Sequence, residues 1–281
     1  MTSYRGFLVW AIAILVILGA FLCFVGLGWP GLPDNCIYLM PDGCYCEAFA
    51  TEEVEAGAAG VRQPVNTWFN LYAIFTSLLV AFFVYQDRKK LSTQAPANLM
   101  RSNSWIPDLY IFAVLFLGLG SMWFHASLTK WGGLLDGFSM YVFAAFLPFY
   151  SLRRFWIGDR FFWTGYLSTL ALFTGLHLLL PAFVNILILV MAYLAVEVAI
   201  WLRTGKVLQG QSTTVSLWLL AVLSIGVATF FWWASRTGNF LCDPASFFQP
   251  HGLIWHPLAG VMAVLLYFYW RKAKDNLLPH A

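Results

Sequence analysis

Two short stretches of this chain carry hydroxyl, imidazole and carboxylate groups inside otherwise apolar sequence. The first holds Ser121, His125 and Asp136, and the second holds His251 and His256. Ionisable side chains are costly at membrane depth, so they are candidates for function where they occur there. Imidazole is a common zinc ligand, and three protein ligands with one water are typical of a catalytic zinc site. The residue types therefore predict a zinc centre built by the three histidines.

Ser121 and Asp136 have both functional and structural interpretations. Ser121 stands four residues before His125 and shares its face of a helix, but a small residue there could equally serve helix packing. Asp136 could be a zinc ligand, a partner that orients a histidine, or a general base acting on a zinc-bound water. Its structural alternative is an N-terminal helix cap.

The spacing of His251 and His256 requires irregular backbone. Residues five apart point roughly 140° away from each other on an ideal helix, so both rings cannot meet one ion. Pro257 disfavours helical geometry at His256, and a π-bulge of one extra residue would bring the two rings together. We therefore expect an irregular helix start at this point. His177 is the alternative ligand, although a core or interfacial role is the better interpretation for it.

The elements that position these residues are apolar segments long enough to cross a bilayer. The chain has 281 residues, of which 60% are hydrophobic and 10% charged, whereas a soluble domain carries roughly 25% charged residues. Its basic residues are dispersed, which argues against a nucleic-acid partner. Apolar stretches of roughly 20 residues, the length of a spanning helix, occur at Phe7–Trp29, Val65–Tyr85, Leu109–Leu128, Leu134–Tyr150, Phe161–Leu180, Ala182–Leu202, Val215–Ala234 and His251–Trp270.

We therefore predict an all-α transmembrane protein, with a seven-helix core bundle and one additional N-terminal transmembrane helix. The N-terminal helix is interpreted as a retained anchor, because its apolar run exceeds the roughly 7–15 residues of a signal peptide. The predicted divisions are the anchor at 1–29, an outer loop that caps the bundle at 30–63, the core at 64–272 and a tail at 273–281.

The distribution of basic residues predicts the orientation. With the N-terminus inside, the outer side holds only Arg62, Lys130 and Arg236 of the 16 Lys and Arg residues. This is a strong positive-inside bias, so both termini are expected in the cytoplasm. The topology then brings Ser121, His125, Asp136 and the two later histidines to the same outer depth. This convergence of distant segments is the main argument for a site.

Four of the five cysteines, Cys36, Cys44, Cys46 and Cys242, then face the outer side. Four cysteines in an oxidising compartment can pair in three ways. A zinc site at Cys44 and Cys46 would have atypical spacing, so disulfides are favoured. Cys23 lies within the first span, where we expect it to be buried and inert.

The motifs resemble those of the alkaline ceramidases, which belong to a superfamily of seven-span membrane hydrolases that also includes the adiponectin-type receptors. The family pattern is Ser-x3-His, a later Asp, and histidines around a Trp-His pair at the start of the last span. In this chain it reads Ser121, His125, Asp136 and His251-Gly-Leu-Ile-Trp-His256. The segments Cys242-Asp-Pro and Asn66-Thr-Trp-Phe-Asn70 are also similar, and the resemblance covers about 45–270.

The resemblance implies zinc held by the three histidines with a water as the fourth ligand. Asp136 would deprotonate that water, and Ser121 would hydrogen-bond the oxyanion that develops at an amide carbonyl. The products would be a fatty acid and a sphingoid base. The implied substrate is therefore ceramide or a related N-acyl lipid, which would reach the site sideways from the bilayer.

The chain departs from the family pattern at three places. The last two histidines of the family are usually four apart rather than five, and Gly137 stands where an acidic residue usually follows the Asp. The calcium-binding stretch of the family reads Cys44-Tyr-Cys46-Glu47 here, with Gln63 near a later Glu position. Glu47 could still bind Ca²⁺, which makes calcium a second candidate ion. The same alignment would pair Cys46 with Cys242 and leave Cys36 for Cys44.

The sequence thus predicts a zinc-dependent lipid amidase of the membrane, with a ceramide-like substrate and no obligate protein partner evident. An ester-cleaving, phospholipase-like relative is the nearest alternative, because the same site would attack an ester. A receptor of the adiponectin type would keep the metal for structure alone. A transporter is the third alternative, and the absence of paired broken helices or repeat symmetry counts against it.

Overall fold

The computed structural model describes residues 2–34, 45–50, 58–91, 98–179, 182–204 and 212–273. These residues form helices, and the one β-type pairing among them is an isolated bridge between Pro33 and Thr129. The helices are α1 (Thr2–Leu27), α3 (Pro64–Phe69), α4 (Tyr72–Lys90), η1 (Leu99–Arg101), α5 (Ile106–Ser127), α6 (Lys130–Arg153), α7 (Asp159–Leu176), α8 (Ala182–Thr204), α9 (Ser212–Ala234), η2 (His251–Trp255) and α10 (His256–Lys272).

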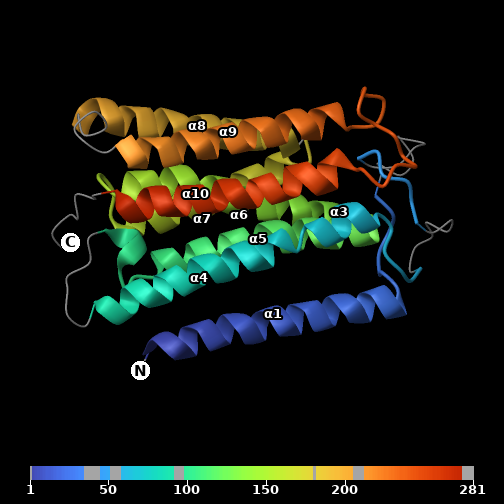
Figure 1. The fold of residues 1–281 in the computed structure, drawn as a ribbon, viewed down its shortest axis with the longest axis horizontal. Coiled ribbons are helices and arrows are strands. Elements are labelled where there is room, and N and C mark those ends of the chain that lie inside the picture. The colour runs from blue at the N-terminus through green and yellow to red at the C-terminus, as the bar shows by residue number, and fades with distance from the viewer. Residues whose placement is uncertain are drawn as a thin grey trace.

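The long helices lie side by side in one bundle, and α1 runs along its edge (Figure 1). The predicted fold class, an all-helical transmembrane bundle with an added N-terminal helix, is confirmed. In the described residues, seven helical segments are long and apolar enough to cross a membrane, with α3 and α4 counted as one and η2 and α10 as another. Of the eight spans predicted from the sequence, the fifth forms α7 and does not meet this criterion. It has 18 residues and begins with Asp159 and Arg160.

The helix α1 packs on the bundle along one face only. It contacts α4, and its buried Ile14 and Phe21 belong to one apolar cluster with Leu115 and Leu119 of α5. Because the remaining face is left uncovered, Cys23 is exposed on α1 rather than buried as the sequence suggested. Beyond α1, the indole of Trp29 donates to the carbonyl of Gly60 at 2.7 Å and ties the end of this segment to the outer loop.

Small residues let the central helices approach closely. A Cβ atom at Gly118 of α5 would collide with Ala73 of α4, and one at Gly260 of α10 would lie 2.5 Å from the Tyr72 ring. Such close approach is typical of helix contacts in membranes, where packing rather than water exclusion drives association. The consequence is that α3, α4, α5 and α10 meet tightly at one end of the bundle.

A buried ion pair lies within the bundle toward the other end. The carboxylate of Glu197 accepts from Ser151 Oγ at 2.5 Å and from the Tyr269 hydroxyl at 2.6 Å, and Arg154 lies 3.4 Å away. A buried charge is tolerated when it is paired and hydrogen-bonded. This cluster therefore has a structural explanation.

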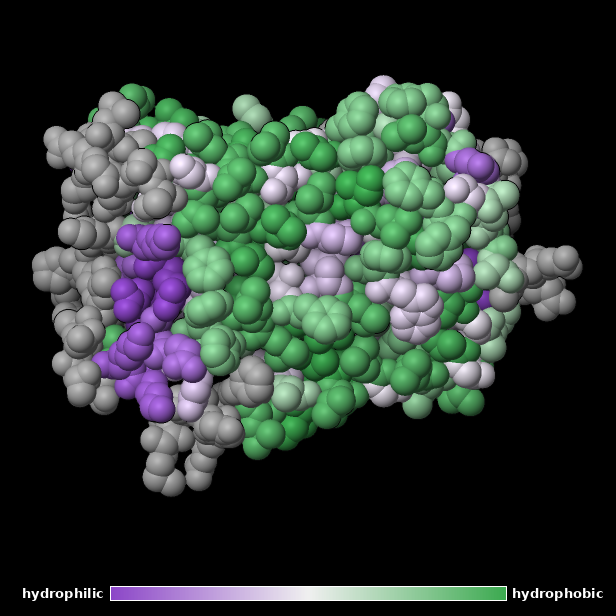
Figure 2. All heavy atoms as spheres, viewed as in Figure 1, coloured by the Kyte–Doolittle hydropathy of each residue, from purple (hydrophilic) through white to green (hydrophobic). Residues whose placement is uncertain are grey.

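The surface is apolar along the helices and hydrophilic at the end where α4 and α10 finish (Figure 2). The last turns of these helices contain Arg88, Lys89 and Lys90, and Arg271 and Lys272. Asp87 anchors Arg271 at this end, with an Nε–Oδ2 distance of 2.6 Å. An apolar surface along the helices, with basic residues at one end, is typical of a bundle that spans a bilayer.

Candidate metal centre

A tight turn between α5 and α6 fixes the first group of candidate residues. Leu128 ends α5 in the left-handed region with φ of 47°, and the Thr129 side chain caps α6 by accepting from Gly132 N at 3.2 Å. Ser121 and His125 therefore lie in the last turns of α5. Asp136 lies inside α6 rather than at its start, so the interpretation of Asp136 as a helix cap is wrong.

The second group stands on irregular backbone, as the spacing predicted. Residues His251–Trp255 form a π-helix that leads directly into α10. The wider turn brings the rings of His251 and His256 to a centroid separation of 4.7 Å, which an ideal helix would not allow. The expected irregular helix start is confirmed.

The three histidines meet in one buried cluster. Each offers a nitrogen within 4.8 Å of those of the others, and in the described part of the chain no other group of three such ligands forms. The Nε2 atoms of His125 and His251 are 3.2 Å apart, and the ring of His256 lies 5.6 Å from that of His125. Three imidazoles that converge on one point form the donor set that zinc prefers.

Hydrogen bonds to amide side chains determine which ring nitrogen carries the lone pair in two of these histidines. Gln63 Nε2 donates to the Glu47 carbonyl at 3.0 Å, so its Oε1 faces His125 Nδ1 at 2.8 Å and accepts a hydrogen bond from the Nδ1–H group. The lone pair of His125 is thereby left on Nε2, the nitrogen that faces His251. A metal-bound histidine usually has its other nitrogen held in this way.

His256 is oriented from the opposite side. Its Nε2 lies 3.4 Å from Nδ2 of Asn70, which is a donor, so Nε2 carries the lone pair. The Nδ1 atoms of His251 and His256 are buried and make no hydrogen bond within the described part of the chain. The residues present therefore fit a zinc ion, because three buried imidazoles converge and the lone pair of His125 is set toward the cluster.

Glu47 supports Gln63, and sequence reasoning gave it a different role. Its carboxylate accepts from the backbone N–H groups of Val65 at 2.6 Å and Asn66 at 2.8 Å, at the start of α3. Burial raises the pKa of Glu47 to about 6, against the lowering effect of these two bonds. The carboxylate thus caps the start of α3. Calcium binding by Glu47 stays a prediction, and no acidic group of three ligands forms among the described residues.

We expect replacement of Gln63 by leucine to weaken zinc binding about 10- to 100-fold, the usual effect of losing a partner of a metal-bound histidine. The reason is that His125 Nδ1 would lose its acceptor and the ring its fixed direction. The measurement is zinc affinity of the purified protein in competition with a chelator. Gln63→Glu is the matched control, because a carboxylate also accepts from Nδ1; equal affinities of Gln63→Leu and wild type would contradict this role.

Ser121 and Asp136 lie beside the histidine cluster. Both are buried and line the same cavity as His251 and His256. The Ser121 hydroxyl accepts from Asn70 Nδ2 at 3.2 Å. The cavity therefore brings together four of the five residues singled out from the sequence, and His125 joins them through the histidine cluster.

The cavity extends from this site between α6, α8, α9 and α10. It has a volume of about 460 Å³ and an apolar wall that includes Met140, Leu147, Leu194 and Leu266. Leu266 follows His256 by ten residues on α10, which is about 15 Å along the helix axis. The cavity is thus long and apolar, with its polar groups at one end.

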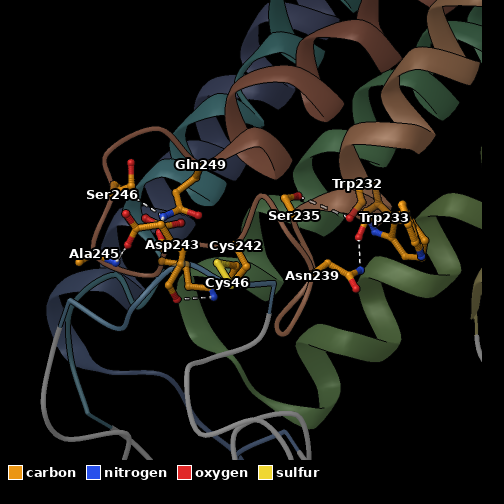
Figure 3. Close-up of a disulfide and its surroundings, with 12 residues drawn as sticks. Cys46, Trp232, Trp233, Ser235, Asn239, Cys242, Asp243, Ala245, Ser246 and Gln249 are labelled. Carbon is orange, nitrogen blue, oxygen red and sulfur yellow. Dashed lines mark hydrogen bonds between the residues drawn. A yellow bond between two sulfur atoms is a disulfide. The ribbon is translucent and has the colours of Figure 1, made fainter.

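A disulfide holds the loop segment that lies against His251. Cys46 and Cys242 are bonded, with their Cα atoms 5.5 Å apart (Figure 3). The preceding residue, Tyr45, has a left-handed φ of 61° and stacks on the ring of His251 at 4.5 Å between centroids. The pairing implied by the family resemblance is present, whereas Cys36 and Cys44 lie outside the described residues.

His177 does not join the cluster. Its Nδ1 lies 2.8 Å from the Tyr141 hydroxyl, which also accepts from Asn185 Nδ2 at 3.1 Å. Its ring fills the space beside Gly137, where a Cβ atom would come within 2.7 Å of it. The structure therefore favours the structural interpretation of His177 over its role as a ligand.

Comparisons with known proteins agree with this arrangement. A search of curated proteins finds no match. The family model described as Ceramidase matches residues 61–276, which include the helices α3 to α10 and all the candidate site residues. Because this match covers most of the chain, the protein belongs to the ceramidase family.

Proposed function

We propose that this protein is an integral-membrane, zinc-dependent hydrolase that cleaves the amide bond of ceramide or a related N-acyl lipid. The observation that carries the proposal is the buried cluster of His125, His251 and His256 beside Asp136, at the polar end of a long apolar cavity. Family membership supports a hydrolase, and the cavity supports a lipid substrate.

The proposed chemistry divides among few residues. A bound zinc ion would polarise a carbonyl and lower the pKa of a water molecule. Asp136 would take the proton of that water and return it to the leaving nitrogen, because its carboxylate lies at the cavity wall beside the cluster. Ser121 lines the same cavity as Asp136, and its hydroxyl would help to bind the reacting carbonyl.

The proposed orientation places this site toward the outer side of the membrane. The histidine cluster lies at the end of the bundle opposite the last turns of α4 and α10 (Figure 1). Those turns contain five basic residues, which favour the cytoplasmic side. A lipid in the bilayer would then enter with its chain in the cavity and its amide at the histidines.

A substrate panel tests the proposal. Purified protein in detergent would be incubated with ceramide, another N-acyl lipid and a matched ester lipid, each labelled in the acyl chain. We expect labelled fatty acid from the amides. Fatty acid released from the ester lipid alone would show that the protein is an ester hydrolase and not an amidase. If no lipid releases fatty acid, the hydrolase proposal fails and a receptor is the better interpretation.

We expect Ala221→Leu to shift the substrate preference toward shorter acyl chains. Ala221 is buried in α9 and lines the cavity away from the histidines, so a larger side chain would shorten the space for the chain. The ratio of kcat/KM for long over short chains should fall about tenfold, as expected for a misfit of one or two methylenes. Leu223→Phe, on the exposed face of the same helix, is the control; an unchanged ratio in Ala221→Leu would contradict this use of the cavity.

A further inference from the structure

Asn70 is a fully buried amide at the wall of the cavity that sequence reasoning left without a role. It lies at the break between α3 and α4, where its backbone N–H bonds back to the Thr67 carbonyl. The close packing of Gly118 against this turn brings Asn70 up to α5. The break thus presents a side-chain amide at the same place as Ser121 and His256.

The direction of this amide is set by its neighbours. Nδ2 lies 2.8 Å from the carbonyl oxygen of Asn66, which can only accept, so the nitrogen and not Oδ1 must face it. One of the two amide protons is therefore committed to Asn66. The second proton faces Ser121 Oγ at 3.2 Å and His256 Nε2 at 3.4 Å, both long contacts.

Neither of these two acceptors can hold the second proton strongly during the reaction. A metal ion on His256 Nε2 would occupy the lone pair that now faces Asn70. The contact with Ser121 Oγ, at 3.2 Å, is at the long end of the range for an N–H···O bond. The second N–H of Asn70 is therefore available to a stronger acceptor that enters the cavity, such as a negatively charged carbonyl oxygen.

We propose that Asn70 is a catalytic residue that donates a hydrogen bond to the substrate carbonyl oxygen as negative charge develops on it. The inference rests on the proposed amide hydrolysis. When the oxygen of water bonds to the carbonyl carbon, the C=O π electrons move to the carbonyl oxygen and the water proton goes to Asp136. When an electron pair of that oxygen re-forms the C=O bond, the C–N bond breaks and its electron pair goes to nitrogen, which takes the proton from Asp136. Asn70 keeps both of its protons and stabilises the charged oxygen.

Kinetics of Asn70 variants test this role. In Asn70→Ala we expect kcat to fall about 10²- to 10³-fold, as for loss of one oxyanion donor, with KM changed less than about threefold. A lipid phosphonate that mimics the tetrahedral state should lose affinity by a similar factor. Asn70→Ser is the second variant, because a serine can still bond the carbonyl four residues back and support the turn but is too short to reach the substrate.

Two further readouts separate catalysis from positioning. Zinc affinity should stay within about threefold of wild type; a loss of about 10- to 100-fold would mean that Asn70 only orients His256 and would overturn the proposal. In a Ser121→Ala background, Asn70→Ala should still lower kcat, and no further loss would mean that Asn70 acts only through Ser121. Asn185→Ala removes a buried amide bonded to Tyr141 and is the control, with unchanged kcat.

The same experiments distinguish this proposal from the proposed function. Wild-type protein that releases fatty acid, together with Asn70 variants of normal kcat, overturns the role of Asn70 alone. Wild-type protein that hydrolyses no amide or ester lipid overturns the hydrolase, and the role of Asn70 falls with it.

Discussion

Asp136→Asn is expected to lower fatty acid release about 10²- to 10⁴-fold, the usual contribution of a general acid–base group. Asparagine has the same shape but cannot take a proton from water. The Asp136 carboxylate lines the cavity beside His251 and His256 and is not part of the histidine cluster. Zinc content should therefore remain close to that of wild type.

The control for Asp136→Asn is Asp108→Asn, which alters a carboxylate at the other end of α5. Asp108 pairs with Arg88 near the surface and should affect hydrolysis little. Loss of zinc from Asp136→Asn would make Asp136 a ligand. Hydrolysis at the wild-type rate would remove it from the mechanism.

The variant His125→Ala is expected to lose both the bound zinc and all measurable hydrolysis. His125 is the ring whose tautomer Gln63 fixes, and its Nε2 lies 3.2 Å from that of His251. Two imidazoles without the third form a poor zinc site, because structural and catalytic sites use at least three protein ligands. Zinc per chain should fall from about one to near zero, as measured by elemental analysis of the purified protein.

His177→Ala is the matched control for His125→Ala, because it also removes an imidazole at this end of the bundle. His177 bonds Tyr141 and lies outside the cluster, so its loss should leave the zinc content unchanged. Zinc retained in His125→Ala but lost in His177→Ala would reverse the assignment of the ligands.

The residue types and their spacing predicted which side chains lie together, and the structure brings these side chains together. Ser121 and His125 near the end of α5 and Asp136 in α6 lie on either side of one tight turn, and the topology predicts the same depth for the later histidines. The awkward spacing of His251 and His256 predicted irregular backbone, and the π-helix supplies it. A spacing that does not fit an ideal helix thus predicted the local distortion of the backbone.

The supporting residues could not be found in this way. Gln63 and Asn70 are neutral amides in loops and helix breaks, and their roles depend on which neighbouring carbonyl each faces. Tyr45 reaches His251 only because a disulfide holds its neighbour and its own backbone is left-handed. Such contacts are set by tertiary structure. The expectation that Cys23 is buried failed for a similar reason, since the packing of α1 against α4 and the α5 cluster decides which of its faces is covered.

Zinc titration of metal-free protein tests the central claim most directly. Protein stripped of metal with a chelator would be supplied with increasing zinc while fatty acid release from labelled ceramide is measured. The account predicts no release without zinc, and release that rises with bound zinc and saturates at about one ion per chain. Full hydrolysis by the metal-free protein, or saturation with zinc without any release, would contradict it.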